Sequence, residues 1–306
     1  MPEPRRFALD KPASRRAFLA AASSPLFAAS GKPRVRQVLG EKVSFLDGDR
    51  LLFEYRYAGS IPKTYVHPLC GPDGAPITLD SPADHVHHRG LMLAWSDVNG
   101  FDFWGETNPG RHGSIVHQKF ERMREKPDPR FTSLEHWIAE GRLLLVERRT
   151  LRVPILSGEA VWIEWSTELE ATDAPVTLSA RDHVYNGLGI RFIRSMDSGA
   201  VLNANGTSEI AKANGEPAAW CAYHGKCEKG GMAGAVIFDH RSNPRHPTPF
   251  FVMNKPFGYL SAAPTFRDPF ELPPGRPLRL RYAVASFLGE ADRPRMESWY
   301  RRWLAC

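Results

Sequence analysis

The sequence predicts an all-β fold, a large antiparallel β-sandwich that ends in one short helix. Its 25 glycines and 26 prolines among 306 residues favour many turns between short strands over a bundle of long helices. Several segments also alternate apolar and polar residues with a period of two, which is typical of strands with one buried face. No internal repeat, low-complexity linker or sustained charge run divides residues 31–306, so we expect a single domain there.

Residues 1–30 are predicted to be a leader and not part of the fold. The run Ser14-Arg15-Arg16-Ala17-Phe18-Leu19 has the serine, arginine pair, phenylalanine and leucine of a twin-arginine export signal. The apolar stretch that follows, residues 18–29, is well short of the roughly 20 residues that span a bilayer as a helix. We expect the precursor to use the twin-arginine export machinery and the mature chain to be periplasmic or secreted, without a membrane anchor.

Charge and cysteine content exclude two other classes of protein. The leader holds five basic and two acidic residues, which leaves 35 basic and 32 acidic residues in the mature chain. No stripe of basic and aromatic residues remains, so we expect no nucleic-acid partner. Four cysteines in a chain of this length do not make a disulfide scaffold. Cys221 and Cys227 could pair after export or stay free thiols, and both alternatives remain open.

The first strands are expected near the start of the mature chain. Residues 43–46 and 51–57 are apolar runs on either side of Asp47-Gly48-Asp49, a turn sequence, and together predict a hairpin. Residues Leu91–Trp95 form a further apolar run and predict a buried strand.

Later segments continue the β pattern until the C-terminal end. Residues 160–169 alternate, with the face that includes Glu164 expected to be wet, and residues 278–284 have the same period. Residues 235–238 are continuously apolar and predict a strand buried on both faces. Arg293–Leu304 places large apolar residues three and four positions apart, which predicts an amphipathic helix.

Histidines are concentrated in one third of the chain. Six of the eleven lie within residues 67–117, and the densest segment is residues 80–90, DSPADHVHHRG. In an extended backbone His85 and His87 would face one side and His88 the other. Imidazoles on one face can bind a metal ion or act as acid and base. The alternative is a structural turn in which the histidines bond backbone carbonyls and Arg89 pairs with a nearby aspartate.

Further polar residues mark other candidate positions. Trp104 could offer a flat face to a sugar ring, although most tryptophans belong to the core. Arg191 lies between apolar residues, so it could hold a carboxylate or ligand oxygen, with a structural ion pair as the equal alternative. His240 and His246 lie in a loop directly after the expected buried strand, and sites in β-sandwiches are often built on such loops.

The same residues carry a resemblance that spans most of the mature chain. It resembles the bacterial family labelled PmoA family, or methane oxygenase PmoA, in His67-Pro68, Gly71-Pro72-Asp73-Gly74, His85-Val86-His87-His88-Arg89-Gly90, Asn99-Gly100, Phe103-Trp104-Gly105-Glu106, Gly187-Leu188-Gly189-Ile190-Arg191-Phe192, Phe238-Asp239-His240 and Asn243-Pro244-Arg245-His246-Pro247. The label implies a subunit of a membrane copper enzyme, which needs transmembrane helices, and the sequence offers none after the leader. The resemblance implies instead a supersandwich similar to galactose mutarotases and related carbohydrate-active proteins, whose sites pair a histidine acid with a carboxylate base.

We therefore expect an exported enzyme that acts on a sugar or glycoside by histidine and carboxylate acid–base chemistry, as an isomerase, lyase or hydrolase. A non-catalytic carbohydrate-binding protein and a metal-dependent enzyme are the alternatives. The first expectation requires no cofactor, and the metal alternative would place a divalent ion at His85 and His87. Local chemistry assigns catalytic roles to His87, His88, Glu106 and His240, and ligand-binding roles to His85, Arg89, Trp104, Arg191 and His246. We expect the charged and histidine members of this set to converge on one concave face.

Overall fold

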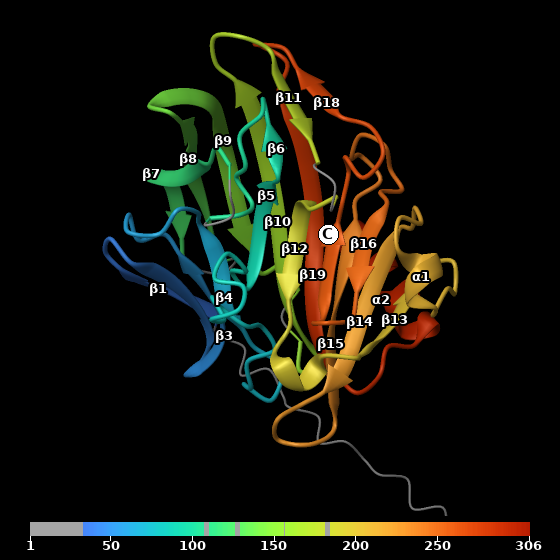
Figure 1. Ribbon diagram of the computed structural model, residues 1–306. Helices are drawn as coiled ribbons and strands as arrows, with labels where there is room; N and C mark the ends of the chain where they lie inside the picture. Colours follow the sequence, from blue (N-terminus) through green and yellow to red (C-terminus); the bar gives the residue numbers. More distant parts are fainter. Residues whose placement is uncertain (1–32, 107–109, 126–128, 156, 181–183) are drawn as a thin grey trace, which may run out of the picture.

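Two large antiparallel sheets stacked face to face form the body of the protein (Figure 1). The computed structural model describes residues 33–106, 110–125, 129–155, 157–180 and 184–306. The predicted export signal lies outside these residues. Each large sheet has eight strands, and a third sheet has three. The all-β sandwich predicted from the turn residues and the period-two patterns is therefore confirmed.

The first sheet contains, in spatial order, β1 (Pro33–Val38), β2 (Lys42–Asp47), β3 (Arg50–Arg56), β4 (Tyr65–Leu69), β5 (Leu91–Trp95), β12 (Asn186–Arg191), β17 (Tyr259–Ala262) and β16 (Phe250–Met253). The second contains β13 (Ala200–Asn203), β14 (Trp220–Lys226), β15 (Met232–Asp239), β19 (Leu278–Leu288), β10 (Ala160–Ala171), β9 (Arg142–Arg152), β8 (Arg130–Ala139) and β7 (Gly113–Arg124). The small sheet contains β18 (Phe270–Leu272), β11 (Val176–Ser179) and β6 (Asp97–Val98).

Helical structure is limited to three short segments among the described residues, namely η1 (Arg194–Met196), α1 (Ile210–Ala213) and α2 (Arg293–Leu304). The bounds of α2 agree with the predicted amphipathic helix. Asp292 caps its first turn by accepting a hydrogen bond from the backbone N–H of Arg295. Within the described part of the chain, no helix is both long and apolar enough to cross a membrane.

The predicted hairpin is formed by β2 and β3, with Asp47 paired to Arg50 across the turn. Gly48 has a φ of 61°, a left-handed conformation that glycine adopts at little cost. The cysteine alternatives are also resolved, because Cys221 and Cys227 are both free thiols in this structure.

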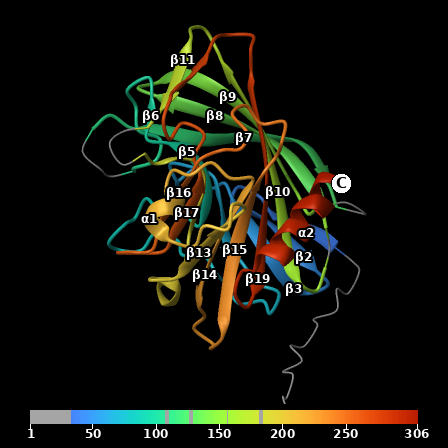
Figure 2. The same ribbon diagram turned by 90° about the vertical axis from the view of Figure 1, so that its right-hand side faces the viewer.

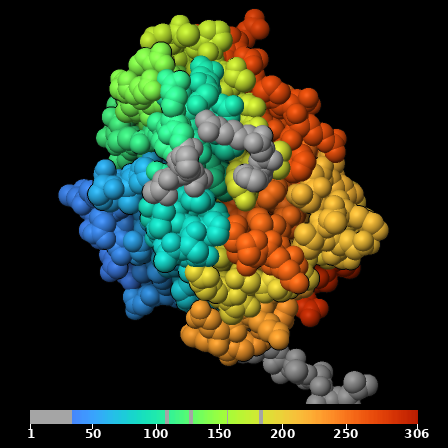
Figure 3. Space-filling view, viewed as in Figure 1, coloured from blue at the N-terminus to red at the C-terminus, as the bar shows by residue number. Residues whose placement is uncertain are grey.

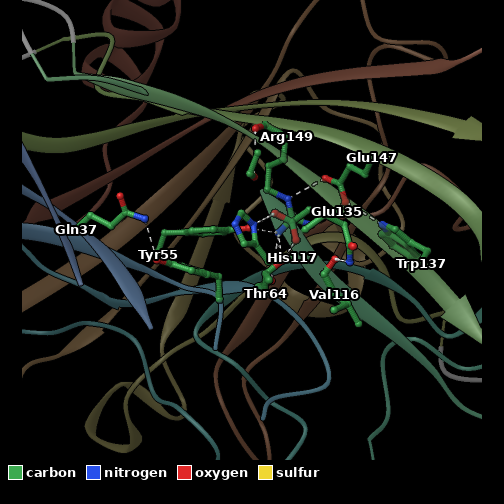
Figure 4. Close-up of polar contacts among 12 residues, drawn as sticks. Gln37, Tyr55, Thr64, Val116, His117, Glu135, Trp137, Glu147 and Arg149 are labelled. Atoms are coloured by element: carbon green, nitrogen blue, oxygen red, sulfur yellow. Dashed lines mark hydrogen bonds and ion pairs between the residues drawn. The ribbon is translucent and has the colours of Figure 1, made fainter. Parts of the chain in front are cut away.

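A buried polar network ties the two sheets together inside the sandwich (Figure 4). The Tyr55 hydroxyl on β3 donates to Glu135 Oε1 on β8 at 2.7 Å, which joins one sheet to the other. Arg149 on β9 donates to the Thr64 hydroxyl at 2.6 Å and pairs with Glu147 at 2.7 Å. Because a buried ion without its partner is costly, these bonds fix the register of one sheet against the other.

The outer face of the second sheet is partly covered by α2 (Figure 2). Trp162 on β10 packs against Trp299 of the helix, with ring centroids 5.6 Å apart, and Glu164 accepts a hydrogen bond from the Trp303 indole at 2.7 Å. The prediction that this face of residues 160–169 would be wet is therefore wrong for the first half of the strand. The alternation of residues within one strand does not predict that a helix distant in the sequence will pack over its outer face.

We expect Glu147→Gln to destabilise the protein by about 3–5 kcal/mol, because it removes the carboxylate that pairs directly with the buried Arg149 guanidinium. Urea unfolding of the mature chain measures this change. Glu140→Gln is the matched control, since Glu140 pairs with Arg111 on the exposed surface and should change the midpoint far less. Equal midpoints for the two variants would contradict a structural role for the network.

Candidate functional site

The histidine segment folds as a turn and not as a strand. The His85 N–H donates to the Pro82 carbonyl at 2.9 Å, and the His88 N–H donates to the His85 carbonyl at 3.0 Å. The expectation that His85 and His87 share a face with His88 opposite is therefore wrong. Instead the three rings meet, with centroids 4.8 Å apart for His85 and His88 and 4.6 Å apart for His87 and His88. We call these three residues the histidine cluster.

Close packing against β4 fixes the end of this turn. Gly90 has a φ of 53°, and a Cβ atom there would collide with the Val66 carbonyl oxygen. Only glycine satisfies both conditions without strain. The turn therefore enters β5 at one fixed position beside β4.

The carboxylate of Glu106 contacts two cationic side chains beside the histidine cluster. Arg89 donates to it from Nε at 3.0 Å and from Nη2 at 2.6 Å, and Lys63 Nζ lies 3.3 Å from Oε1. Lys63 also donates to the Trp104 carbonyl. Asp80 is a weaker partner of Arg89, at 3.6 Å. One alternative from the sequence paired Arg89 with a nearby aspartate, whereas its main partner is Glu106. We call Lys63, Arg89 and Glu106 together the Glu106 ion network.

Burial sets the charge of each group in this network. Burial alone would raise the pKa of Glu106, but hydrogen bonds from Arg89 and the charge of Lys63 outweigh it and hold that pKa below its usual value. Burial lowers the pKa of Lys63 to about 8, even though Glu106 favours its charged form. Glu106 therefore stays ionised at neutral pH, and this geometry favours a positioning carboxylate over one that exchanges protons.

The three histidines lie at increasing depth. The side chain of His85 is 32% exposed, whereas His87 is 8% exposed and His88 only 1%. Burial and the positive charge of Lys63 lower the pKa of His87 to about 4, and burial with the neighbouring histidines lowers that of His88 to about 2. His87 and His88 are therefore neutral at pH 7, and His85 opens the cluster to solvent.

Aromatic rings surround the inner histidines. Phe257 lies 4.7 Å from the His85 ring and 4.8 Å from the His88 ring, and Tyr259 lies 5.8 Å from His88. Trp104 is buried, and its ring stacks on Tyr185 at 5.2 Å. The expectation that Trp104 presents an open face to a sugar is therefore wrong, because neighbouring rings enclose it as part of the wall behind the cluster.

Arg191 joins the same region from β12. Its guanidinium lies 4.4 Å from the Phe257 ring centroid and pairs with Asp197 at 3.2 Å, while Nη1 also donates to the Gly258 carbonyl at 3.1 Å. Its buried Nε and Nη2 atoms make no hydrogen bond with any described residue. The structure thus contains the predicted ion pair and leaves donor capacity on the same side chain.

His240 and His246 form a second group. His240 Nε2 lies 3.1 Å from Arg281 Nη1, and the His240 ring packs against Trp303. His246 Nδ1 lies 2.7 Å from the buried carboxylate of Asp239. These contacts belong to the second sheet and α2, whereas the histidine cluster lies on the first sheet. The structure therefore brings His85, His87, His88, Arg89, Glu106 and Arg191 close together and places His240 and His246 elsewhere, whereas the predicted concave face stays a prediction.

The histidine cluster lies where two distant parts of the chain meet. On the face shown in Figure 3, the blue-green part of the chain adjoins the orange part, in agreement with the contact between His85 and Phe257. Residues from positions 63, 85–89, 106, 191 and 257 are brought together here by the first sheet and its connections.

One family model matches this chain. Residues 42–301 match the model described as a family of unknown function, DUF6807. The chain belongs to the DUF6807 family. No curated protein matches it.

Lys63 is the residue of this DUF6807 site that sequence reasoning missed. It follows Pro62 in a loop before β4 and lies in no recognisable pattern. Only its burial, at 1% exposure, and its contact with Glu106 separate it from a surface lysine. No local sequence signal could have found it.

Metal ligation was a further expectation for His85 and His87. Among the described residues of this DUF6807 chain, no three histidine, cysteine, aspartate or glutamate side chains are arranged to hold one metal ion. The described residues therefore provide no third metal ligand beside His85 and His87.

We expect the His87 imidazole to remain neutral as the pH falls through 6.5 and to gain its proton only near pH 4, because burial and Lys63 oppose the charged form. Two-dimensional NMR of ring nitrogens in histidine-labelled protein measures this, with His87→Gln identifying the signal. A midpoint near 6.5 would contradict the buried position of the ring beside Lys63.

Proposed function

We propose that this protein is an exported carbohydrate-active enzyme that binds a sugar or glycoside at the histidine cluster and transfers a proton there. The observation that carries the proposal is the graded burial of three adjacent imidazoles beside the Glu106 ion network. His85 meets solvent, and His87 and His88 extend inward from it. In this arrangement His85 would be the first of the three that a ligand meets, and the neutral ring of His87 lies next to it at 5.8 Å between centroids.

His87 is the proposed base. A general base must enter the reaction without its proton, and the lowered pKa of His87 keeps the ring neutral at physiological pH. A neutral imidazole has one donor and one acceptor nitrogen, so it can bond a sugar hydroxyl in either direction. His85 and His88 supply further nitrogens of the same kind, which suits a ligand with several neighbouring hydroxyls.

The surrounding cations favour negative charge that develops on the ligand. Lys63 and Arg89 act on His87, and Arg191 with Lys63 acts on His88, each making a proton on the ring less favourable. The same fixed positive charges stabilise an alkoxide or enolate oxygen formed when a hydroxyl or a C–H group loses its proton. Proton abstraction from a sugar, as in an isomerase or lyase, therefore fits this site better than protonation of a leaving group by a histidine.

Glu106 takes a different role from the acid–base partner expected from the sequence. Its carboxylate is occupied by Arg89 and Lys63, so it positions these cations and does not contact the ligand. We assign it as a positioning residue. Glu106→Gln should then shift the pH profile of turnover through Lys63, a readout that a purely structural role would leave unchanged.

We expect His87→Gln to reduce turnover by about 10²- to 10⁴-fold, the contribution typical of a positioned acid–base group. NMR-monitored turnover of a panel of aldoses, uronic acids, oxidised sugars and nitrophenyl glycosides measures it. His136→Gln, on the second sheet, is the matched control and should keep full activity. Full activity in His87→Gln, or no turnover of any panel member by the native protein, would contradict the proposal.

The pH profile of kcat/KM should be bell-shaped, and the pKa values of two buried groups, His87 and Lys63, should determine its two limbs. The acid limb falls near pH 4, because His87 stays neutral until then, and the alkaline limb near pH 8, where Lys63 loses its charge. An acid limb near 6.5 would mean that a histidine with an ordinary pKa is the base.

Export is part of the proposal and is supported by the sequence of the leader alone. Replacing Arg15 and Arg16 with lysines should retain the precursor in the cytoplasm, because the export machinery recognises the arginine pair. Mass spectrometry of the extracytoplasmic fraction detects the mature chain, and its undiminished presence in the double variant would contradict the twin-arginine route.

A further inference from the structure

A second hollow lies on the other sheet, away from the histidine cluster. It occupies about 550 Å³ on the part of the outer face that α2 leaves uncovered, where β7, β8 and β9 continue beyond the helix (Figure 2). Its lining comes from four neighbouring strands, β8, β9, β10 and β19, with β7 and the loop after β15 at its ends. We call it the arginine groove; its lining includes Arg122, Thr132, Arg148, Thr150, Ser166, Arg279 and Arg281.

Positive charge exceeds negative charge in this groove. Four arginines line it against two glutamates, Glu121 and Glu168. Arg148 pairs with Glu121 at 3.5 Å. Arg279 uses Nε to pair with Glu168 at 2.8 Å, and its two terminal amino groups make no hydrogen bond or ion pair with any described residue. Its side chain is 69% exposed, so these donors face solvent. Arg122 likewise has no ion pair among the described residues, which leaves it available for an anion.

Uncharged polar groups form the floor between the arginines. Thr132 lies opposite Thr150, and their hydroxyls are 2.8 Å apart, while Ser166 lies opposite Thr150 on the next strand and opposite Arg281 on the strand after it. This row crosses four strands, a span of roughly 14 Å at the usual strand spacing. Hydroxyl groups at this spacing can exchange hydrogen bonds with a chain that itself carries hydroxyls.

The positive surface extends past the first hollow. A neighbouring hollow of about 490 Å³ shares Arg122, Thr132 and Thr150 with it and adds Arg124 and Arg130 to the lining. At the other end, Arg281 is oriented by Glu164 at 2.7 Å. An elongated ligand therefore meets the guanidinium nitrogens of Arg122 and Arg279 that are unpaired among the described residues, whereas Arg148 and Arg281 are already paired with glutamates.

We propose that the arginine groove binds an acidic oligosaccharide, with its carboxylate or sulfate groups on the arginines and its hydroxyls on the threonine and serine floor. Guanidinium groups pair with such anions through two parallel hydrogen bonds. An extended peptide could find backbone partners only at the free edge of β7, because β8, β9, β10 and β19 are each paired on both sides.

The test uses the mature chain and four defined tetramers in isothermal titration calorimetry. These are oligogalacturonate, a sulfated chondroitin fragment, neutral galactotetraose and tetraglutamate. We expect at least tenfold tighter binding of one or both acidic glycans than of galactotetraose and tetraglutamate, with an affinity that falls as salt is added. The ratio of the two acidic glycans tells whether a chain with both carboxylate and sulfate groups binds more tightly than one with carboxylates alone.

The variants locate the binding on the sheet face. Arg122→Gln combined with Arg279→Gln should weaken acidic-glycan binding at least tenfold while leaving turnover at His87 unchanged. Arg34→Gln combined with Arg36→Gln is the matched control, since these exposed arginines lie on β1 of the other sheet.

Three results would overturn the proposal. They are equal affinity for tetraglutamate and the acidic glycans, no preference of acidic over neutral glycan, and equal binding by the native chain and the Arg122/Arg279 variant. None of them bears on catalysis at the histidine cluster, so failure here and failure of the proposed function are separable.

Discussion

The ion network around Glu106 is the constraint on which the candidate site depends. Lys63 and Arg89 come from two connections of the first sheet and Glu106 from the segment between β6 and β7, and among the described residues the Glu106 carboxylate contacts both cations. Removing its charge would leave two cations facing each other in a buried space, at high cost. The network therefore holds the turn of residues 80–90 against the segment that ends at Glu106, and the histidine cluster takes its position from that turn.

The same network explains the protonation state of the cluster. A histidine close to an isolated carboxylate would gain a proton, but at this site the carboxylate is already matched by two cations. What remains for His87 is burial and the nearby charge of Lys63, and both lower its pKa. The interior network of Tyr55, Glu135 and Arg149 serves a different purpose, because it is fully buried and ties the two sheets that carry the sites.

Local patterns predicted the fold well and the site only in part. The hairpin around Gly48 and the helix Arg293–Leu304 are determined by residues close together in the sequence, so local patterns could predict them. The sequence left an extended segment and a turn at His85 as alternatives, because the choice depends on packing against β4. The position of His246 depends on which strands pair far along the chain, and no local pattern reports that. Lys63 became visible only through its burial beside Glu106.

The most direct test of the account is a crystal structure of the mature chain with a sugar selected from the panel that binds or reacts. The account predicts a sugar hydroxyl or carbonyl oxygen within hydrogen-bonding distance of a ring nitrogen of His87, with the pair between Arg89 and Glu106 intact. A neutral sugar bound only in the arginine groove, or ordered only at His240 and His246, would contradict the assignment of the histidine cluster as the reacting site.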